Sequence, residues 1–260
     1  MSKIVLITGA SRGIGFELAK KFAQEGFDQV LVARSEEKLL EIKNYLETQY
    51  RISVDVIAKD LSVKDAAEEI YRTLSSNGKH IDILVNNAGL GDFGDFAQSD
   101  WNKQYDMIQL NITALVHLTR LFLNPMLEQG YGRILNVASA ASFQPGPFMS
   151  VYYATKAFVL SFSEALTREL KGSGVTVTAL CPGPTQTDFI TTASMENSNL
   201  LNSLKLANAE EVAAYGYHAL MKGTPVMIHG LANKLLIFSI RFAPRSWVRE
   251  ITYKLQREIT

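Results

Sequence analysis

Two adjacent tyrosines precede a lysine in "SVYYATKAF", and the spacing lets one of them cooperate with it. In a helix, residues four apart lie on one face, whereas neighbours in sequence point about 100° apart. Tyr152 is therefore expected over Lys156, and Tyr153 faces elsewhere. A phenol has a reference pKa of about 10 and exchanges protons poorly near neutral pH. A nearby ammonium would lower the pKa of Tyr152, which could then donate a proton to a substrate oxygen.

A glycine-rich segment near the start of the chain could bind phosphate. The apolar run 3–8 is followed by "TGASRGIG", with Gly9, Gly13 and Gly15, and a helical pattern begins at Ile14. Glycines let the backbone turn tightly and approach a pyrophosphate, whose charge then lies at a helix N-terminus. The spacing differs from the commonest G-x-G-x-x-G fingerprint, and the alternative is a turn without a ligand. Its position between a strand and a helix predicts a dinucleotide site.

The residue after the second predicted strand bears on which dinucleotide binds. A fold of this kind that prefers NAD carries Asp or Glu here to accept from ribose hydroxyls, whereas this chain has Arg34. Arg34 and Arg12 could hold a 2′-phosphate through charge-assisted hydrogen bonds, which favours NADP(H). The alternative is two solvated arginines, because two glutamates follow closely. Asp60, after the third strand, would face the adenine edge unless it caps the next helix.

The elements that must position these residues follow from the apolar pattern. Seven strand-length apolar runs occupy 3–8, 29–33, 53–58, 81–86, 132–139, 174–180 and 225–230. Helical spacing of apolar residues separates most of them, at 14–26, 35–48, 64–77, 101–128, 150–171 and 209–222. Alternation of this kind, with strands that show no polar face, predicts an α/β fold: a Rossmann-type doubly wound, seven-stranded parallel sheet with helices on both faces, in a single domain.

Three further motifs complete an ordered set. "NNAG" spans 86–89, "NVAS" ends at Ser139, and "PGPTQT" spans 182–187. Together with TGxxxGxG, Asp60 and YxxxK, they resemble the short-chain dehydrogenase/reductase family from Met1 to about Gly230. "NNAGLGDFGDF" and "QPGPFMSVYYATKAF" are most similar to a general bacterial-type branch whose substrates are largely undefined. The resemblance implies an NADP-dependent oxidoreductase acting on CH–OH groups.

The resemblance also implies roles for individual residues. Ser139 would hydrogen-bond the substrate oxygen, and Lys156 would bind the nicotinamide ribose. The positive nicotinamide ring of the oxidised cofactor would join Lys156 in lowering the pKa of Tyr152. Asn111 would position a water in a proton relay behind the lysine; the alternative is an asparagine bonded locally within its helix. The expected cofactor contacts are Gly9, Ser11, Arg12, Gly13, Ile14, Gly15, Arg34, Asp60, Leu61, Asn86, Asn87, Ala88, Gly89, Tyr152, Lys156, Pro182, Gly183, Thr185 and Thr187, with Asn86 the main contact from its motif.

Apolar residues near these motifs are candidates for the substrate pocket. They are Phe93, Phe96, Phe143, Phe148, Met149, Phe189, Met195, Leu200 and Leu204. Such a wall would suit a lipophilic ketone, aldehyde or acyl group. Each of these residues could instead belong to the hydrophobic core.

Composition narrows the classes of partner. Equal numbers of Lys plus Arg (26) and Asp plus Glu (26) give no overall field toward nucleic acid. The single cysteine, Cys181, fits a reducing compartment, and the opening segment is too short for a signal-peptide core, so a cytoplasmic protein is expected. Four scattered histidines imply no metal site.

Two segments indicate further contacts. The helical segment 151–170 is apolar around most of its circumference, which favours burial against the sheet and against a second subunit in a homodimer or homotetramer. The basic and apolar extension 231–260 lies beyond the matched region. It could pack on the domain, with the substrate site or a partner subunit beneath it, or lie on a membrane surface, and packing is favoured.

Two other functions share parts of this pattern. A nucleotide-sensing protein would need the glycine loop but not Ser139, Tyr152 and Lys156 together. A nucleotide-sugar epimerase or dehydratase would use the same Tyr and Lys, with a different glycine spacing. The sequence favours a reductase that interconverts a carbonyl and an alcohol.

Overall fold

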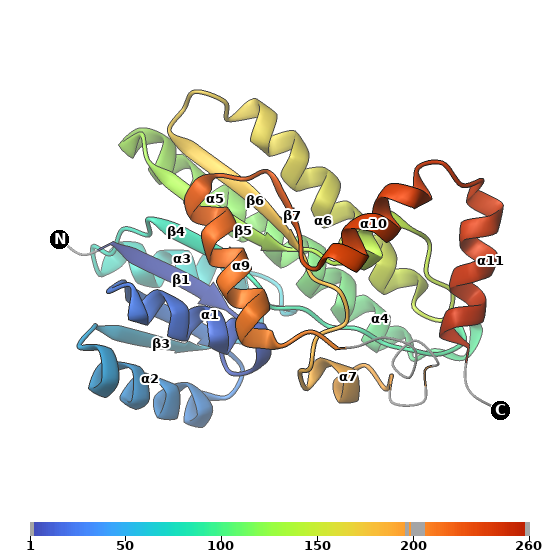
Figure 1. Cartoon of the computed structure of the whole chain (residues 1–260). Coiled ribbons are helices and arrows are strands. Elements are labelled where there is room, and N and C mark those ends of the chain that lie inside the picture. Colours follow the sequence, from blue (N-terminus) through green and yellow to red (C-terminus); the bar gives the residue numbers. More distant parts are fainter. Residues whose placement is uncertain (1–2, 196–197, 199–205, 258–260) are drawn as a thin grey trace.

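One seven-stranded parallel sheet forms the centre of the protein (Figure 1). The computed structural model describes residues 3–195, 198 and 206–257. The strand order is β3-β2-β1-β4-β5-β6-β7. Strands β2 and β3 are added on one side of β1 and strands β4 to β7 on the other, so the order of addition reverses between β1 and β4. The strands are β1 (Ile4–Thr8), β2 (Asp28–Ala33), β3 (Val54–Ala58), β4 (Ile83–Asn86), β5 (Gly132–Val137), β6 (Val175–Cys181) and β7 (Val226–Ile228). The predicted fold class and all seven strands are confirmed.

Helices cover both faces of this sheet. One face carries α1 (Gly13–Gln24), α2 (Glu36–Tyr50) and α9 (Ala209–Lys222). The other carries α3 (Ala66–Ser76), α5 (Leu115–Gln129) and α6 (Ser150–Glu169), with α4 (Trp101–Ile108) leading into α5. The remaining helices are α7 (Phe189–Thr192), α10 (Leu231–Ile240) and α11 (Arg245–Gln256), with short 3₁₀ turns at Phe96–Gln98 and Ala140–Phe143.

Alternation along β1 shows why this sheet is apolar on both sides. Val5 and Ile7 pack with Phe22 of α1, whereas Leu6 between them packs with Phe122 of α5 on the opposite face. Successive strand residues point to opposite faces, so a strand covered on both sides has no position for a polar residue. This continuous apolar character is the signal that predicted a parallel sheet.

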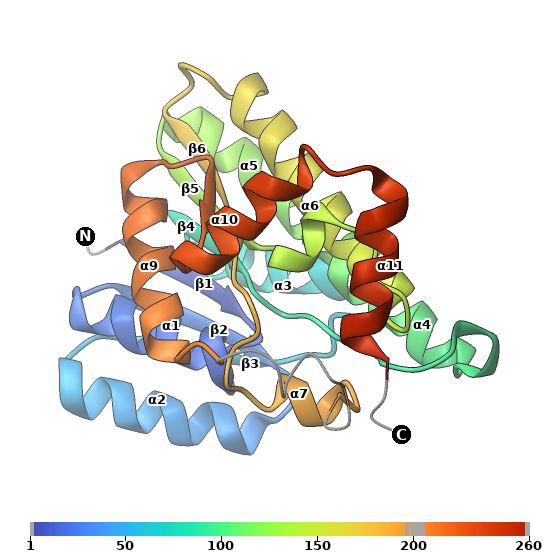
Figure 2. The ribbon, with the colours of Figure 1, turned by 45° about the vertical axis from the view of Figure 1, so that its right-hand side comes forward.

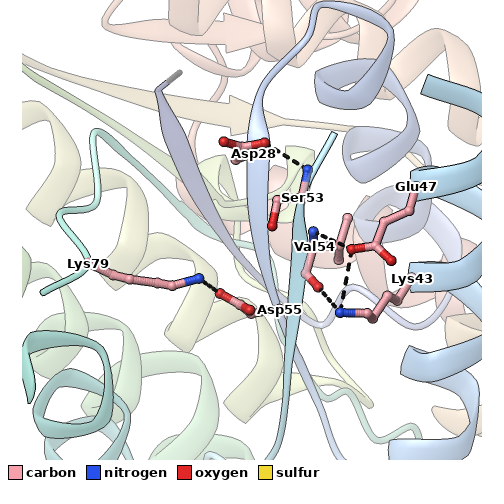
Figure 3. A network of polar contacts seen from close by, with 7 residues as sticks. All are labelled: Asp28, Lys43, Glu47, Ser53, Val54, Asp55 and Lys79. Carbon is pink, nitrogen blue, oxygen red and sulfur yellow. Dashed lines mark hydrogen bonds and ion pairs between the residues drawn. The ribbon is translucent and has the colours of Figure 1, made fainter. Parts of the chain in front are cut away.

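Polar contacts hold the edge strand β3 where no further strand pairs with it (Figure 3). The backbone nitrogen of Val54 donates to Glu47 Oε1 over 2.9 Å, and its carbonyl accepts from Lys43. On the same strand Asp55 pairs with Lys79. Side chains of α2 therefore occupy backbone groups that an exposed edge would otherwise offer to another chain.

The long predicted helix 101–128 is three segments in the structure. A π-helical stretch, Gln109–Ala114, separates α4 from α5. Apolar spacing is nearly unchanged by one inserted residue, so the sequence pattern could not reveal it. Within the residues that the structure describes, no helix has both the length and the apolar character needed to cross a membrane.

The chain ends in two helices that arch beside the carboxyl end of the sheet (Figure 2). Helix α10 follows β7, and α11 returns alongside α6. Val248, Thr252 and Gln256 form the buried face of α11. The extension therefore packs on the domain and contributes to the site described next.

Candidate active site

A cavity of about 880 Å³ lies where the strands end. Its walls come from the loops after β1 to β6 and from α10 and α11. Of the residues predicted to bind cofactor, those that line it are Gly9, Ser11, Arg12, Gly13, Ile14, Arg34, Asp60, Leu61, Asn87, Ala88, Gly89, Tyr152, Lys156, Pro182, Gly183, Thr185 and Thr187. The carboxyl edge of a parallel sheet, beside the reversal of strand order, is where such folds bind ligands.

The glycine-rich loop is built so closely that side chains would not fit. Gly9 has a φ of +65°, which glycine adopts without strain. A Cβ on Gly15 would lie 2.2 Å from the carbonyl oxygen of Gly9 and 2.5 Å from Asn87 Nδ2. Asn87 Nδ2 itself donates to the carbonyls of Thr8, at 2.9 Å, and Gly9. Gly15 thus packs against the backbone of Gly9, and Asn87, directly after β4, holds this loop in place at the N-terminus of α1.

Four cationic side chains line one end of the cavity. Arg34 and Arg12 are there as predicted, together with Lys38 and Lys59. Arg12 Nη1 lies 3.5 Å from Asp188 Oδ2, and both side chains are largely exposed. Asp60 also lines this end, and its Oδ1 accepts from Ser62. Helix α3 begins only at Ala66, so Asp60 does not cap it.

Ser139, Tyr152 and Lys156 meet on the opposite wall of the same cavity. Ser139 begins the 3₁₀ turn after β5, where its hydroxyl accepts from the backbone nitrogen of Ala141 over 3.0 Å. Lys156 Nζ lies 5.9 Å from the centre of the Tyr152 ring. Helix α6 thus carries both side chains on one face, as their spacing predicts.

Burial determines the pKa of Tyr152 in the protein alone. Burial raises the pKa of Tyr152 to about 12, and its hydrogen bond with Ser139 opposes that rise. Burial also lowers the pKa of Lys156 to about 8, while the nearby Cys181 opposes that fall. Lys156 Nζ donates to the carbonyl of Val137 over 2.8 Å. In the protein alone the pKa of Tyr152 therefore lies above its ordinary value, because desolvation of the phenolate outweighs any effect of the ammonium; the joint effect of Lys156 and an oxidised nicotinamide stays a prediction.

Asn111 lies in the π-helical stretch, and both polar atoms of its side-chain amide form hydrogen bonds. Its Oδ1 accepts from the backbone nitrogen of Leu90, and its Nδ2 donates to the Leu90 carbonyl, each over 2.9 Å. Nδ2 also donates to Thr155 Oγ1 of α6. A Cβ on Gly89 would lie 3.3 Å from Asn111 Oδ1 and 3.4 Å from Lys156 Nζ. Asn111 does not line the cavity, yet its amide lies just behind Lys156.

Tyr153 has a different environment from its neighbour. It is buried at 7% exposure, and its hydroxyl accepts a hydrogen bond from Gln256 of α11. Burial raises the pKa of Tyr153. The second tyrosine of "SVYYATKAF" thus connects the catalytic helix to the C-terminal helix.

Asn86 lies apart from the other residues of its motif. Its side chain is buried at 3% exposure and lies outside the main cavity. Nδ2 donates to Asn136 Oδ1 of the neighbouring strand over 2.9 Å and to Thr119 Oγ1 of α5 over 3.0 Å. The side chain of Asn86 therefore ties β4 to β5 and α5, whereas Asn87, Ala88 and Gly89 of the same motif line the cavity.

Three of the nine predicted pocket residues line the cavity. Met149, Phe189 and Met195 line the cavity, whereas Phe93, Phe96 and Phe148 do not. Phe96 is 59% exposed on its 3₁₀ turn. Phe148 stacks on Tyr253 of α11, with ring centres 5.3 Å apart, and Phe93 packs against Phe148. The other candidates do not extend the wall: Phe143 packs beside a core cluster, and Leu200 and Leu204 lie outside the described residues.

Sequence reasoning missed several residues that line the cavity. Lys38 and Lys59 follow the second and third strands, where their charge could have been noticed beside Arg34. Asn233, Leu236, Thr252 and Leu255 come from α10 and α11, beyond every family motif. Their position depends on long-range packing that no local pattern encodes.

Comparison with known proteins agrees with this geometry. The family model for short chain dehydrogenase matches residues 3–198. An uncharacterized oxidoreductase of Staphylococcus epidermidis is 34% identical, over 80% of this chain and 88% of the relative. The very-long-chain 3-oxoacyl-CoA reductase-A of Danio rerio is 37% identical, over 70% of this chain and 58% of the relative.

A solved structure extends the likeness to nearly the whole chain. The short-chain dehydrogenase from Sphingobium yanoikuyae in complex with NADPH has a TM-score of 0.82 and 33% identity, covering 92% of this chain and 93% of that one. Motif order, sheet topology and these matches agree. The chain belongs to the short-chain dehydrogenase family of oxidoreductases.

Proposed function

We propose that this protein is an NADP(H)-dependent oxidoreductase that interconverts a lipophilic ketone or aldehyde and its alcohol, with Tyr152 as general acid and base. One observation carries the proposal: a single cavity is lined by the glycine-rich loop at one end and by Ser139, Tyr152 and Lys156 at the other. A dinucleotide lying across the carboxyl edge would thereby bring its reactive end to the phenol.

The residues present fit a dinucleotide. The loop around Gly9 and Gly13 offers backbone without side chains at the start of α1, where a pyrophosphate is stabilised. Thr187 approaches Gly13 from the opposite side, within 3.0 Å of where a Cβ would lie. When bound, the cofactor supplies or accepts the hydride. Lys156 would hold the nicotinamide ribose.

The cationic end supports NADP(H). Arg34 replaces the carboxylate that would repel a 2′-phosphate, and Arg12 and Lys38 line the same end. A guanidinium can hold a phosphate through two parallel hydrogen bonds.

The raised pKa of Tyr152 suits a proton donor. With a pKa of about 12, the phenol holds its proton at neutral pH, until negative charge develops on the substrate oxygen. Ser139, hydrogen-bonded to Tyr152, would orient that oxygen. Lys156, whose pKa of about 8 leaves it largely charged at pH 7, would stabilise the phenolate that remains. Asn111 would position a water that returns a proton from behind Lys156.

The cavity wall beside Tyr152 supports an apolar substrate. Met149, Phe189, Met195 and Leu236 line it, and no Lys, Arg or His other than Lys156 lines that part among the described residues. Such a surface favours a lipophilic carbonyl compound, of which a 3-oxoacyl thioester is one class.

The test is NADPH oxidation against a panel of ketones, aldehydes and 3-oxoacyl thioesters. Turnover is expected for apolar members. Tyr152→Phe should reduce turnover on the order of 100-fold or more while NADPH affinity stays nearly unchanged, because the substitution removes the hydroxyl that donates the proton and keeps the ring. Tyr153→Phe is the matched control and should retain most activity.

Equal losses in the two variants would show that Tyr152 is not the acid. A protein that binds NADPH tightly but oxidises none of the panel would instead be a nucleotide sensor, and binding of a nucleotide sugar would favour an epimerase or dehydratase.

We also infer a homodimer or homotetramer. Phe158 on α6 is 41% exposed and stacks with Phe162, so the outer face of this helix presents an apolar surface. A symmetric contact through α6 would cover it.

A further inference from the structure

The C-terminal helices carry an unusual amount of exposed apolar surface. Half of the large apolar side chains exposed in the described part of the chain lie on or between α10 and α11. We name this set the terminal patch: Leu231, Leu235, Leu236, Phe238, Phe242, Trp247, Ile251, Tyr253 and Leu255. Phe242 is 76% exposed and Trp247 66%. Exposed apolar side chains gathered on two neighbouring helices in this way mark an interaction site.

Helical spacing separates the terminal patch from the packed face. On α11, Trp247, Ile251 and Leu255 recur every fourth residue on the outer side. One position further along, Val248, Thr252 and Gln256 are buried, and Gln256 donates to Tyr153. The packed face therefore holds α11 on the domain while the other apolar face remains uncovered.

On α10 the same separation holds. Leu231, Leu235, Phe238 and Phe242 follow one side, and Ile237 is the buried residue of the helix. Figure 2 shows both helices on the outside of the molecule, joined in an arch. The two outer faces thus belong to one projecting part of the protein.

Cations surround this surface. The described residues of the two helices and their connections include Lys234, Arg241, Arg245, Arg249, Lys254 and Arg257, against the single acid Glu250. Lys254 Nζ lies 3.7 Å from Glu250 Oε1. The whole chain has no net charge, whereas the described residues of this arch are predominantly basic.

We propose that the terminal patch docks on the surface of an anionic phospholipid bilayer. Apolar residues that include an exposed tryptophan, flanked by Lys and Arg, are the composition that inserts at the headgroup boundary without crossing the membrane. A second copy of the chain is a poorer occupant, because a symmetric contact would bring the same cations together. Charge complementarity selects the lipid surface.

The cavity opens within this patch. Leu236 and Leu255 both line the cavity and are 52% and 40% exposed, one on each helix. Asn233 and Thr252 line it beside them. A lipophilic carbonyl compound dissolved in the bilayer would therefore enter beside Tyr152 without passing through water. This last step rests on the proposed function, whereas docking does not.

Vesicle binding tests the docking directly, with no substrate or cofactor present. The chain has two tryptophans, so Trp101→Phe leaves Trp247 as the only fluorophore of its kind. With vesicles of phosphatidylcholine containing a third phosphatidylglycerol, its emission should shift to the blue and become protected from iodide. Flotation should show binding to these vesicles and at least about 10-fold weaker binding to pure phosphatidylcholine.

Two variants identify the residues responsible. Arg245→Glu with Arg249→Glu should weaken binding to the anionic vesicles roughly 100-fold, because four units of charge change at the surface. Trp247→Ser should weaken it roughly 10-fold. The matched controls, Arg168→Glu with Lys171→Glu and Trp101→Ser, alter exposed residues on other elements and should leave binding unchanged.

Unshifted Trp247 emission with every vesicle, or binding that the patch variants do not alter, would overturn the proposal. So would a self-associating protein that Trp247→Ser makes monomeric, because the patch would then be a contact between copies.

Delivery from the bilayer is measured separately. Reduction of a ketone held in anionic vesicles should fall about 10-fold or more in the double arginine variant, while reduction of a water-soluble ketone should not change. If the double arginine variant reduced the ketone in vesicles as fast as the native protein does, delivery would be overturned and docking would stand. A protein that docks but reduces neither ketone would contradict the proposed function alone.

Discussion

Lys156 is a cation held in the interior, at 5% exposure, with the carbonyl of Val137 as its hydrogen-bond acceptor. Its pKa of about 8 shows that the folded protein disfavours its charged form relative to the unfolded chain. Between that value and the ordinary value of 10.5, the unfolded state binds more protons than the folded state. Stability should therefore rise with pH through this range and be lowest, as far as Lys156 contributes, below pH 8.

Lys156→Met should accordingly stabilise the protein while removing activity. The expected gain in unfolding free energy at pH 7 is on the order of 2 kcal/mol, because a buried charge is replaced by an apolar chain of similar length. Urea denaturation at pH 7 and pH 10 would measure it, and the difference from the native protein should narrow at pH 10. A destabilised variant at pH 7 would show that Lys156 is well compensated.

Arg34→Asp tests the proposed phosphate contact. A carboxylate at this position would repel a 2′-phosphate and accept from ribose hydroxyls, so the ratio of kcat/KM for NADPH over NADH should fall by roughly 100-fold. Lys171→Asp, an exposed cation outside the cavity, is the control. An unchanged ratio would exclude Arg34 from cofactor choice.

At the scale of elements, the sequence predicted most boundaries to within two residues. The first helix was expected from Ile14 and begins at Gly13, and the helix at 209–222 agrees at both ends. These elements bury clear apolar stripes, so spacing alone defines them. The π-helical stretch Gln109–Ala114 was missed, because one inserted residue leaves the apolar spacing of the helix nearly unchanged.

Errors within the site have a common physical cause. Asn86 was assigned by its place within a motif, and Phe148 by its nearness to one. Their side chains instead contact residues far away in sequence: Asn86 bonds Asn136, and Phe148 stacks on Tyr253. The raised pKa of Tyr152 in the protein alone could not be predicted for the same reason, since burial is a property of the whole fold. Residues that act through local backbone, such as Gly9 and Gly15, were predicted correctly in position.

The contact between α6 and α11 can be measured by a double-mutant cycle. Tyr153→Phe and Gln256→Leu each remove one partner of the same hydrogen bond and should each cost about 1 kcal/mol of unfolding free energy. The double variant should cost clearly less than the sum of the two, because the bond can be lost only once. Additive losses in urea denaturation would mean that the two side chains do not interact.

On the scale of the whole molecule, charge and apolar surface are unevenly distributed. Lys, Arg, Asp and Glu balance over the full chain, yet the arch formed by α10 and α11 is basic. The exposed aromatic face of α6 lies on a different element, which separates the surface expected for subunit contact from the surface expected for lipid.

Phe158→Arg should therefore disrupt the homo-oligomer. A symmetric contact would place two new cations opposite each other, so the protein should sediment as a monomer at micromolar concentration. Tyr215→Arg changes a similarly exposed aromatic residue on α9 and should leave the mass unchanged. A variant that keeps the mass of the native assembly would locate the contact elsewhere.

The hydrogen bond between Tyr153 and Gln256 joins the rim of the entrance to the residue next to the proton donor. Any outward swing of α11 that admits a large molecule must first break it. The open protein would then lack this contact between α6 and α11. Entry of a large molecule would therefore cost the free energy of this hydrogen bond, about 1 kcal/mol.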